Sequence, residues 1–114
     1  MTAYRDRSDR CPRCATELID ARAARGCPTC RGLWVALPDL LEMTYAMTPS
    51  PYKLELPFVH SPHQPLACPA CTEVMGTWSL FGVQVDRCDN HGVWFDPDEL
   101  GQILLAVWVR GDAR

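Results

Sequence analysis

The chain has 114 residues, of which 47% are hydrophobic and 22% are charged, and its formal net charge is −3 at pH 7. This length suits one small domain, or two units too small for independent cores, and such units usually depend on a metal ion or on disulfides. The seven cysteines cannot all close into disulfides, because an odd number leaves one unpaired. The acidic balance disfavours general binding to a phosphate backbone, which depends on clustered Lys and Arg.

Composition divides the chain into four parts. The first ten residues are polar and charged, and we expect them to form a tail. A later segment contains five of the ten prolines, which is typical of a partly extended linker, and its apolar residues suggest that it packs against the rest of the chain. We therefore expect a tail (1–10), a first unit (11–47), a linker (48–67) and a second unit (68–110).

The first unit contains two Cys-Pro-x-Cys pairs, at residues 11–14 and 27–30, separated by twelve residues. We expect a short hairpin between them, with strands at 16–19 and 21–25, although the second of these is weak strand material. A helix should begin at Pro38, which suits the first helical position, because apolar residues with a period near 3.6 follow it.

The second unit has a longer hairpin, with sixteen residues between its ligand pairs. We expect strands at 74–80 and 83–87, joined by a turn at Phe81-Gly82. Asp96 is predicted to cap the following helix, with Pro97 at the first helical position and Glu99 completing a capping box.

The two units are copies of one sequence pattern. Equivalent positions are 57 residues apart at the first pair of each unit, 61 apart at the second pair and 60 apart beyond it. Because each copy repeats the same order of features, we predict a duplicated unit. The equivalent residues are Cys11 and Cys68, Cys14 and Cys71, Cys27 and Cys88, Cys30 and His91, Trp34 and Trp94, and Leu40 and Leu100.

Each copy contains a complete set of metal ligands. Structural zinc takes four tetrahedral ligands, commonly as two pairs with two intervening residues. We therefore expect two Zn²⁺ ions, one per unit, and the repeat favours this sequential pairing over an interleaved one. Iron is the competitor at the four-cysteine site, whereas the histidine of the second site favours zinc. The predicted ligands are Cys11, Cys14, Cys27 and Cys30 in the first unit, and Cys68, Cys71, Cys88 and His91 in the second.

Other residues near these pairs have alternative interpretations. His60 and His63 lie among the linker prolines, where solvated or hydrogen-bonded residues are expected in preference to a third metal site. Surface recognition is one role for the two equivalent tryptophans, but we expect them to cover the metal sites and to pack on the following helices. Gly32 and Gly92 are expected to permit the turn after each second pair, through a close approach or a positive φ.

These residues resemble the transcription factor IIB-type zinc-ribbon family of small bacterial proteins. Its pattern is Cys-Pro-x-Cys, a hairpin, Cys-Pro-x-Cys, then Gly-x-Trp-ϕ-Asp and a helix near Glu-Leu. The resemblance implies a small, metal-stabilised α+β fold of two tandem zinc ribbons, each followed by a helix. The first copy departs from the pattern at Ala36, where Asp is usual, and the second at His91. Besides the seven cysteines, the matching residues are Gly32, Trp34, Leu40, Gly92, Trp94, Phe95, Asp96, Glu99 and Leu100.

The absence of long apolar segments indicates where in the cell we expect the protein. The first ten residues contain no apolar signal region, and the longest apolar run, 103–109, is far shorter than the roughly 20 residues that cross a bilayer. We therefore expect a soluble, cytoplasmic protein with reduced cysteines and no membrane partner.

The sequence favours a non-enzymatic zinc-binding adaptor or interaction module for protein partners. Four protein ligands leave no open metal position, and no nucleophile–base pair or phosphate loop is present. The last helix has more apolar residues than one face requires, which indicates a partner surface or self-association. The alternative is nucleic-acid binding or transcription regulation through the basic first ribbon. Residues 1–34 carry seven arginines and four acids, a net charge of +3. The arginines nearest the first site are Arg10, Arg13, Arg22, Arg25 and Arg31.

Overall fold

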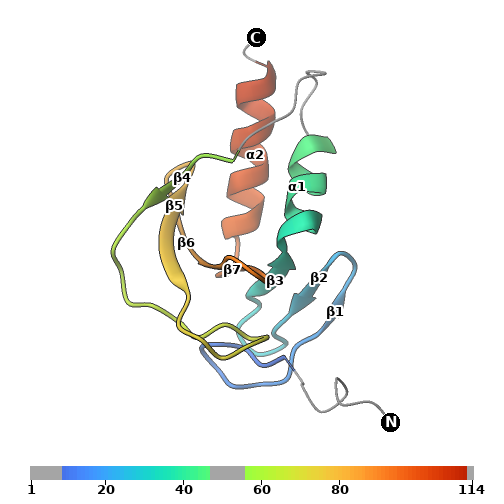
Figure 1. Cartoon of the computed structure of the whole chain (residues 1–114). Coiled ribbons are helices and arrows are strands. Elements are labelled where there is room, and N and C mark those ends of the chain that lie inside the picture. Colours follow the sequence, from blue (N-terminus) through green and yellow to red (C-terminus); the bar gives the residue numbers. More distant parts are fainter. Residues whose placement is uncertain (1–8, 47–55, 113–114) are drawn as a thin grey trace.

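The computed structural model describes residues 9–46 and 56–112 (Figure 1). Within them the chain forms one antiparallel sheet of seven strands and two helices, so the expected small α+β class is confirmed. The strands are β1 (Ile19–Ala21), β2 (Ala24–Gly26), β3 (Leu33–Ala36), β4 (Phe58–His60), β5 (Gly76–Leu80), β6 (Val83–Cys88) and β7 (Gly92–Phe95), and the helices are α1 (Leu37–Ala46) and α2 (Glu99–Asp112). Across the sheet the order is β1-β2-β3-β7-β6-β5-β4.

The second hairpin forms near its predicted position, although β5 begins at Gly76, two residues later than expected. Strands β5 and β6 pair in regular register, and Phe81 and Gly82 make the turn with φ values of 53° and 83°. Two consecutive residues with positive φ are typical of the tight turns whose twist matches that of the flanking strands. The glycine at the second position adopts this φ without the strain that a side chain would cause.

The first hairpin starts later than predicted. Residues 16–18 do not enter β1, because Glu17 forms a bridge with Arg10 and the Leu18 N–H donates to the carbonyl of Asp9. The chain thus returns along its own N-terminal side before it turns into the hairpin. Because the hairpin is also shorter than its counterpart, β1 and β2 contain only three residues each.

Each unit has a third strand that the sequence analysis did not predict. Strands β3 and β7 follow directly after the two turns that end the ligand pairs, and they pair with each other in the middle of the sheet. Their residues alternate between the two faces of the sheet, as in any strand. This central pair joins the two repeats into one continuous sheet.

The linker contributes one of the two edge strands, β4, which pairs with β5 through Phe58, Val59 and His60. The expectation that this segment packs against the rest of the chain is confirmed for these residues. The remainder of the predicted linker, up to residue 55, and residues 1–8 of the predicted tail lie outside the described residues.

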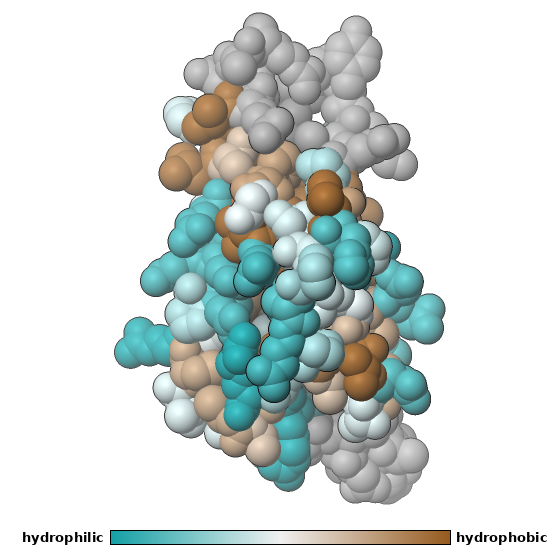
Figure 2. Space-filling model, turned by 90° about the vertical axis from the view of Figure 1, so that its left-hand side faces the viewer, coloured by the Kyte–Doolittle hydropathy of each residue, from teal (hydrophilic) through white to brown (hydrophobic). Residues whose placement is uncertain are grey.

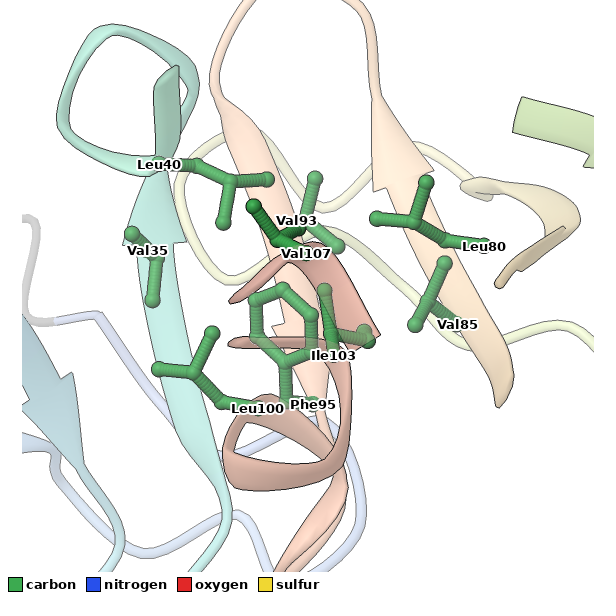
Figure 3. Close-up of a cluster of buried hydrophobic side chains, with 9 residues drawn as sticks. All are labelled: Val35, Leu40, Leu80, Val85, Val93, Phe95, Leu100, Ile103 and Val107. Carbon is green, nitrogen blue, oxygen red and sulfur yellow. The ribbon is translucent and has the colours of Figure 1, made fainter. Parts of the chain in front are cut away.

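Both helices project from one face of the sheet and share a hydrophobic core (Figures 1 and 3). Figure 3 shows side chains from β3, β7 and the β5–β6 hairpin converging on α1 and α2. The repeats pack as one body, because neither helix could bury its apolar face within its own short unit. The core residues are Val35, Leu40, Leu80, Val85, Val93, Phe95, Leu100, Ile103 and Val107.

The start of α2 differs from the prediction. The helix begins at Glu99, because Asp98 has a φ of 71° and so departs from the helical path. Pro97 is therefore not its first residue, and the Asp96 carboxylate binds elsewhere. Half of the capping box is present, since the Asp96 N–H donates to Glu99 Oε1 at 2.9 Å. Neither helix in the described part of the chain has the length and apolar character that a membrane span requires.

Candidate metal centres

The first centre lies in a buried cluster separate from the core that the helices share. Its four cysteines offer sulfur atoms that all lie within 4.8 Å of one another, and all four are free thiols. The first cysteine of each pair is 2% exposed, whereas the second is only half-buried. These residues, which we call the first centre, are Cys11, Cys14, Cys27 and Cys30.

Tight turns aim backbone amides at the sulfur atoms of this centre. The N–H groups of Arg13 and Cys14 donate to Cys11 Sγ at 3.4 and 3.3 Å, and the Cys30 N–H donates to Cys27 Sγ at 3.4 Å. The residue after each pair, Ala15 or Arg31, has positive φ, at 61° and 68°. Because amide donors stabilise a negatively charged sulfur, this geometry prepares the thiolates that a cation binds.

The second centre repeats this arrangement with one histidine. It consists of Cys68, Cys71, Cys88 and His91, whose ligand atoms also lie within 4.8 Å of one another. The Nδ1 atom of His91 lies 3.3 Å from Cys88 Sγ and 3.8 Å from Cys68 Sγ. Thus the histidine occupies the position of the fourth sulfur and presents Nδ1 to the centre.

Individual thiols of the two centres have strongly shifted pKa values. Burial and hydrogen bonds with neighbouring thiols raise the pKa of Cys14 to about 12. Burial is also the main cause that raises the pKa of Cys68 to about 12. Although burial opposes it, the N–H groups of Cys30 and Thr29 lower the pKa of Cys27 to about 6. A divalent cation would displace the remaining protons, so both residue sets fit a metal ion that prefers sulfur and imidazole ligands.

A pair of tryptophans lies between the two centres. Trp34 and Trp94 are 6% and 1% exposed, and they belong to a buried cluster that includes cysteines of both centres. They cover the sites, as predicted, but the prediction that they pack on the following helices is wrong. Because side chains alternate along a strand, their neighbours Val35 and Phe95 contact the helices instead.

Asp96 forms a contact between the repeats that the sequence analysis missed. Its Oδ1 and Oδ2 atoms accept the guanidinium of Arg13 at 2.6 and 2.9 Å, and its Oδ1 also accepts the Trp94 indole N–H at 3.1 Å. The hydrogen bond to Asp96 raises the pKa of Arg13. The repeat contained one signal of this contact, because both of its residues are replaced by alanine at the equivalent positions. These are Ala70 for Arg13 and Ala36 for Asp96.

The two equivalent glycines permit close approaches. Neither Gly32 nor Gly92 is among the residues with positive φ. A Cβ on Gly32 would overlap the Trp94 ring, and a Cβ on Gly92 would overlap the backbone carbonyl of Val35 in the neighbouring strand. Of the two roles expected from the sequence, the close approach is therefore the one that the structure supports.

The linker histidines are not part of a metal cluster. Within residues 9–46 and 56–112, neither belongs to a group of three or more potential ligands. His63 contacts the Ser61 carbonyl through Nδ1 at 2.8 Å and lies 3.3 Å from Asp86 through Nε2. His60 lies in β4, where its ring packs perpendicular to that of Trp78, with 6.0 Å between the ring centroids. The expectation of a hydrogen-bonded residue holds for His63.

Three of the five arginines proposed for nucleic-acid binding have partners within the chain. Arg13 binds Asp96, Arg25 lies 3.3 Å from Asp9 and 3.7 Å from Asp20, and Arg10 donates to the Ala15 carbonyl at 3.1 Å. Arg22 and Arg31 are exposed, and among the described residues no ion pair involves them.

Comparison with known proteins identifies only the second unit. Residues 67–106 match a transcription factor zinc-finger family, the TFIIB-type zinc ribbon. This segment is about one third of the chain, and it contains the whole second centre. The match does not include the first unit, whose likeness to a zinc ribbon rests on the repeat and on its own cluster of four cysteines. No curated protein and no solved structure matches the chain significantly.

Proposed function

We propose that the protein is a non-enzymatic module that binds two Zn²⁺ ions and presents an apolar helix surface to a protein partner. The observation that carries this proposal is the exposure of large apolar side chains on both helices, in addition to those that form the shared core. These side chains, which we call the helix surface, are Leu41, Tyr45, Leu105, Trp108 and Val109, and they are 43 to 59% exposed.

The ligand chemistry supports zinc. Thiolate sulfur and imidazole nitrogen are the common ligands of structural zinc, and four converging ligands at each centre are typical of such sites. A four-cysteine centre can also hold iron, whereas the histidine of the second centre favours zinc. Metal analysis of the protein purified from its native cells tests this point. Two zinc ions per chain are expected, and iron at the first centre would contradict that part of the proposal.

The closed ligand sets also support a role without catalysis. A catalytic zinc keeps a position for water or substrate, which four protein ligands do not leave. At both centres the ligands come from turns at the ends of strands, and the tryptophans bury the space between them. The role that we assign to each ion is to hold one unit of the fold.

The helix surface contains fewer residues than the sequence suggests, because some apolar residues of α2 are buried and only the others are exposed. Ile103 and Val107 are buried in the shared core, so they do not contribute to it. Figure 2 shows the side on which β4 to β6 lie: hydrophilic side chains cover most of its middle, and hydrophobic ones gather toward the helix ends. Exposed aromatic and aliphatic groups together suit a protein partner, because aromatic residues contribute much of the binding energy at protein interfaces.

The test is a capture experiment with a matched control. The protein is used to capture partners from its native cells with and without nuclease, in parallel with Leu105→Ser/Trp108→Ser and with Val74→Ser. Val74 is 72% exposed but lies at the bridge before β5, away from the helices. We expect a nuclease-resistant partner that the double variant loses and the control retains. Equal capture by all three proteins would contradict the proposal. A monomer mass for the isolated protein would exclude self-association.

Nucleic-acid binding is the second candidate, because Arg22 and Arg31 are exposed and the matched family is described as a transcription factor zinc-finger. Phosphate contacts release counterions, so a true interaction weakens steeply as salt rises. The experiment is a salt titration with duplex and single-stranded probes, repeated with Arg22→Gln/Arg31→Gln. Absence of binding at low salt eliminates this candidate.

A further inference from the structure

A continuous set of contacts joins the two metal centres. Strand β7 begins directly after His91 of the second centre and ends one residue before Asp96. The Asp96 carboxylate holds Arg13 by two charge-assisted hydrogen bonds of 2.6 and 2.9 Å. Arg13 itself lies inside the first ligand pair, and its backbone N–H donates to Cys11 Sγ. One short strand therefore has a ligand of the second centre at one end and a partner of the first centre at the other.

The buried tryptophans make a second connection. The Trp94 side chain from β7 lies against Gly32, two residues after the last ligand of the first centre, so closely that no Cβ fits there. Its indole N–H donates to Asp96, which fixes the carboxylate that Arg13 binds. Trp34 packs in the same cluster beside cysteines of both centres. Movement at either centre would therefore disturb tightly packed side chains next to the other.

The polar part of this connection occurs once, although the fold is duplicated. The positions equivalent to Arg13 and Asp96 hold Ala70 and Ala36. The equivalent contact, between the Cys68–Cys71 pair and the end of β3, therefore has no charged groups. The equivalent contact lacks both charged partners, so a tandem zinc-ribbon arrangement does not itself require the ion pair. The Arg13–Asp96 ion pair can therefore be removed by substitution without changing any metal ligand.

We propose that the two centres bind metal cooperatively and that the Arg13–Asp96 pair carries part of the coupling. A cation at the first centre orders its ligand turns, and this fixes the direction of the Arg13 side chain. Arg13 then holds Asp96 and the end of β7, whose start positions His91 for the second centre. Coupling of this kind is reciprocal, so each ion increases the affinity for the other. The inference rests on the proposed binding of zinc at both centres.

Native mass spectrometry measures this coupling, because it counts chains with no, one or two ions. Two independent and equal sites leave about half of the chains with one ion at half saturation, and unequal independent sites leave more. We expect clearly fewer singly loaded chains when the metal-free protein is titrated with Zn²⁺. A singly loaded fraction at or above about half would overturn the proposal.

Variants then assign the coupling to the ion pair. Asp96→Asn retains all eight ligands and an acceptor for the Trp94 indole, and it should raise the singly loaded fraction by reducing the coupling several-fold, within the roughly 5- to 150-fold range usual for coupled sites. Arg25→Gln is the control, because it removes the ion pairs of Arg25 with Asp9 and Asp20 and leaves both Arg13 and Asp96 in place. The role of Asp96 is refuted if Asp96→Asn loads as the wild type does, or if both variants change equally.

A parallel titration with Co²⁺ shows which centre fills first, since its absorption depends on the number of sulfur ligands. Failure to load either centre would contradict the proposed zinc binding, whereas independent loading of both centres would contradict only their coupling.

Discussion

Trp34 lies directly opposite Trp94 in the β3–β7 pair, and the two residues occupy the same position in the two repeats. On either side of them, Leu33 pairs with Phe95 and Val35 pairs with Val93. The register is therefore symmetric about the tryptophan pair. The two repeats meet as the subunits of a twofold dimer do, each using the same strand, although they belong to one chain. This relationship explains why both tryptophans are buried between the centres.

Removal of the metal should unfold the protein. Neither unit has enough core of its own, and the free energy of metal binding in such units contributes directly to folding. After chelation we expect loss of the helical circular dichroism signal and of hydrogen-exchange protection in β3 and β7. Retention of both signals at complete metal removal would show that the core between sheet and helices is sufficient.

Metal affinity should rise with pH. A thiol whose pKa is raised stays protonated at neutral pH, as for Cys14 and Cys68 at about 12, so a cation must displace its proton. Acidification then favours the metal-free form, by about tenfold in affinity per pH unit for each proton displaced. Competition with a chelator of known proton affinity measures this slope. An affinity independent of pH between about 6 and 8 would contradict the raised pKa values.

Gly92 should tolerate no side chain. In Gly92→Ala the new Cβ meets the Val35 carbonyl, so the central strand pair must separate, at a cost of about 3 kcal/mol or more. Gly101→Ala is the matched control, because no atom lies within 4 Å of its Cβ and it lies in α2. There alanine should stabilise by up to about 1 kcal/mol. Denaturant unfolding of both metal-loaded variants gives the comparison, and similar free energies would refute it.

Residues of α2 should divide into core and surface positions. Ile103 is fully buried, so Ile103→Ala should lower the free energy of unfolding by about 2–5 kcal/mol. Leu105 is 59% exposed, and Leu105→Ala should change the free energy of unfolding by no more than about 0.5 kcal/mol. Thermal and denaturant unfolding measure both values. A large effect of Leu105→Ala would show that the helix surface is covered within the chain.

The spacing of the cysteine pairs, together with the repeat, predicts which four side chains form each centre. A pair with two intervening residues can only close over a few ångströms, so its partners are local and its geometry is readable from the sequence. The second hairpin is likewise local, and its Phe81-Gly82 turn follows from the preference of glycine for positive φ. The two helices follow from their periodicity, apart from the first residues of α2, where Asp98 breaks the helical path.

Only the tertiary structure decides how the two repeats join. The four residues of β3 or β7 are too few for periodicity to separate a strand from a loop, and their partner lies about 60 positions away. The pairing of Trp34 with Trp94, the burial of both rings away from the helices, and the ion pair between Arg13 and Asp96 all depend on this meeting. Asp96 shows the reason: locally it is suited to cap a helix, but a guanidinium 83 positions away in the chain binds its carboxylate once the sheet has formed.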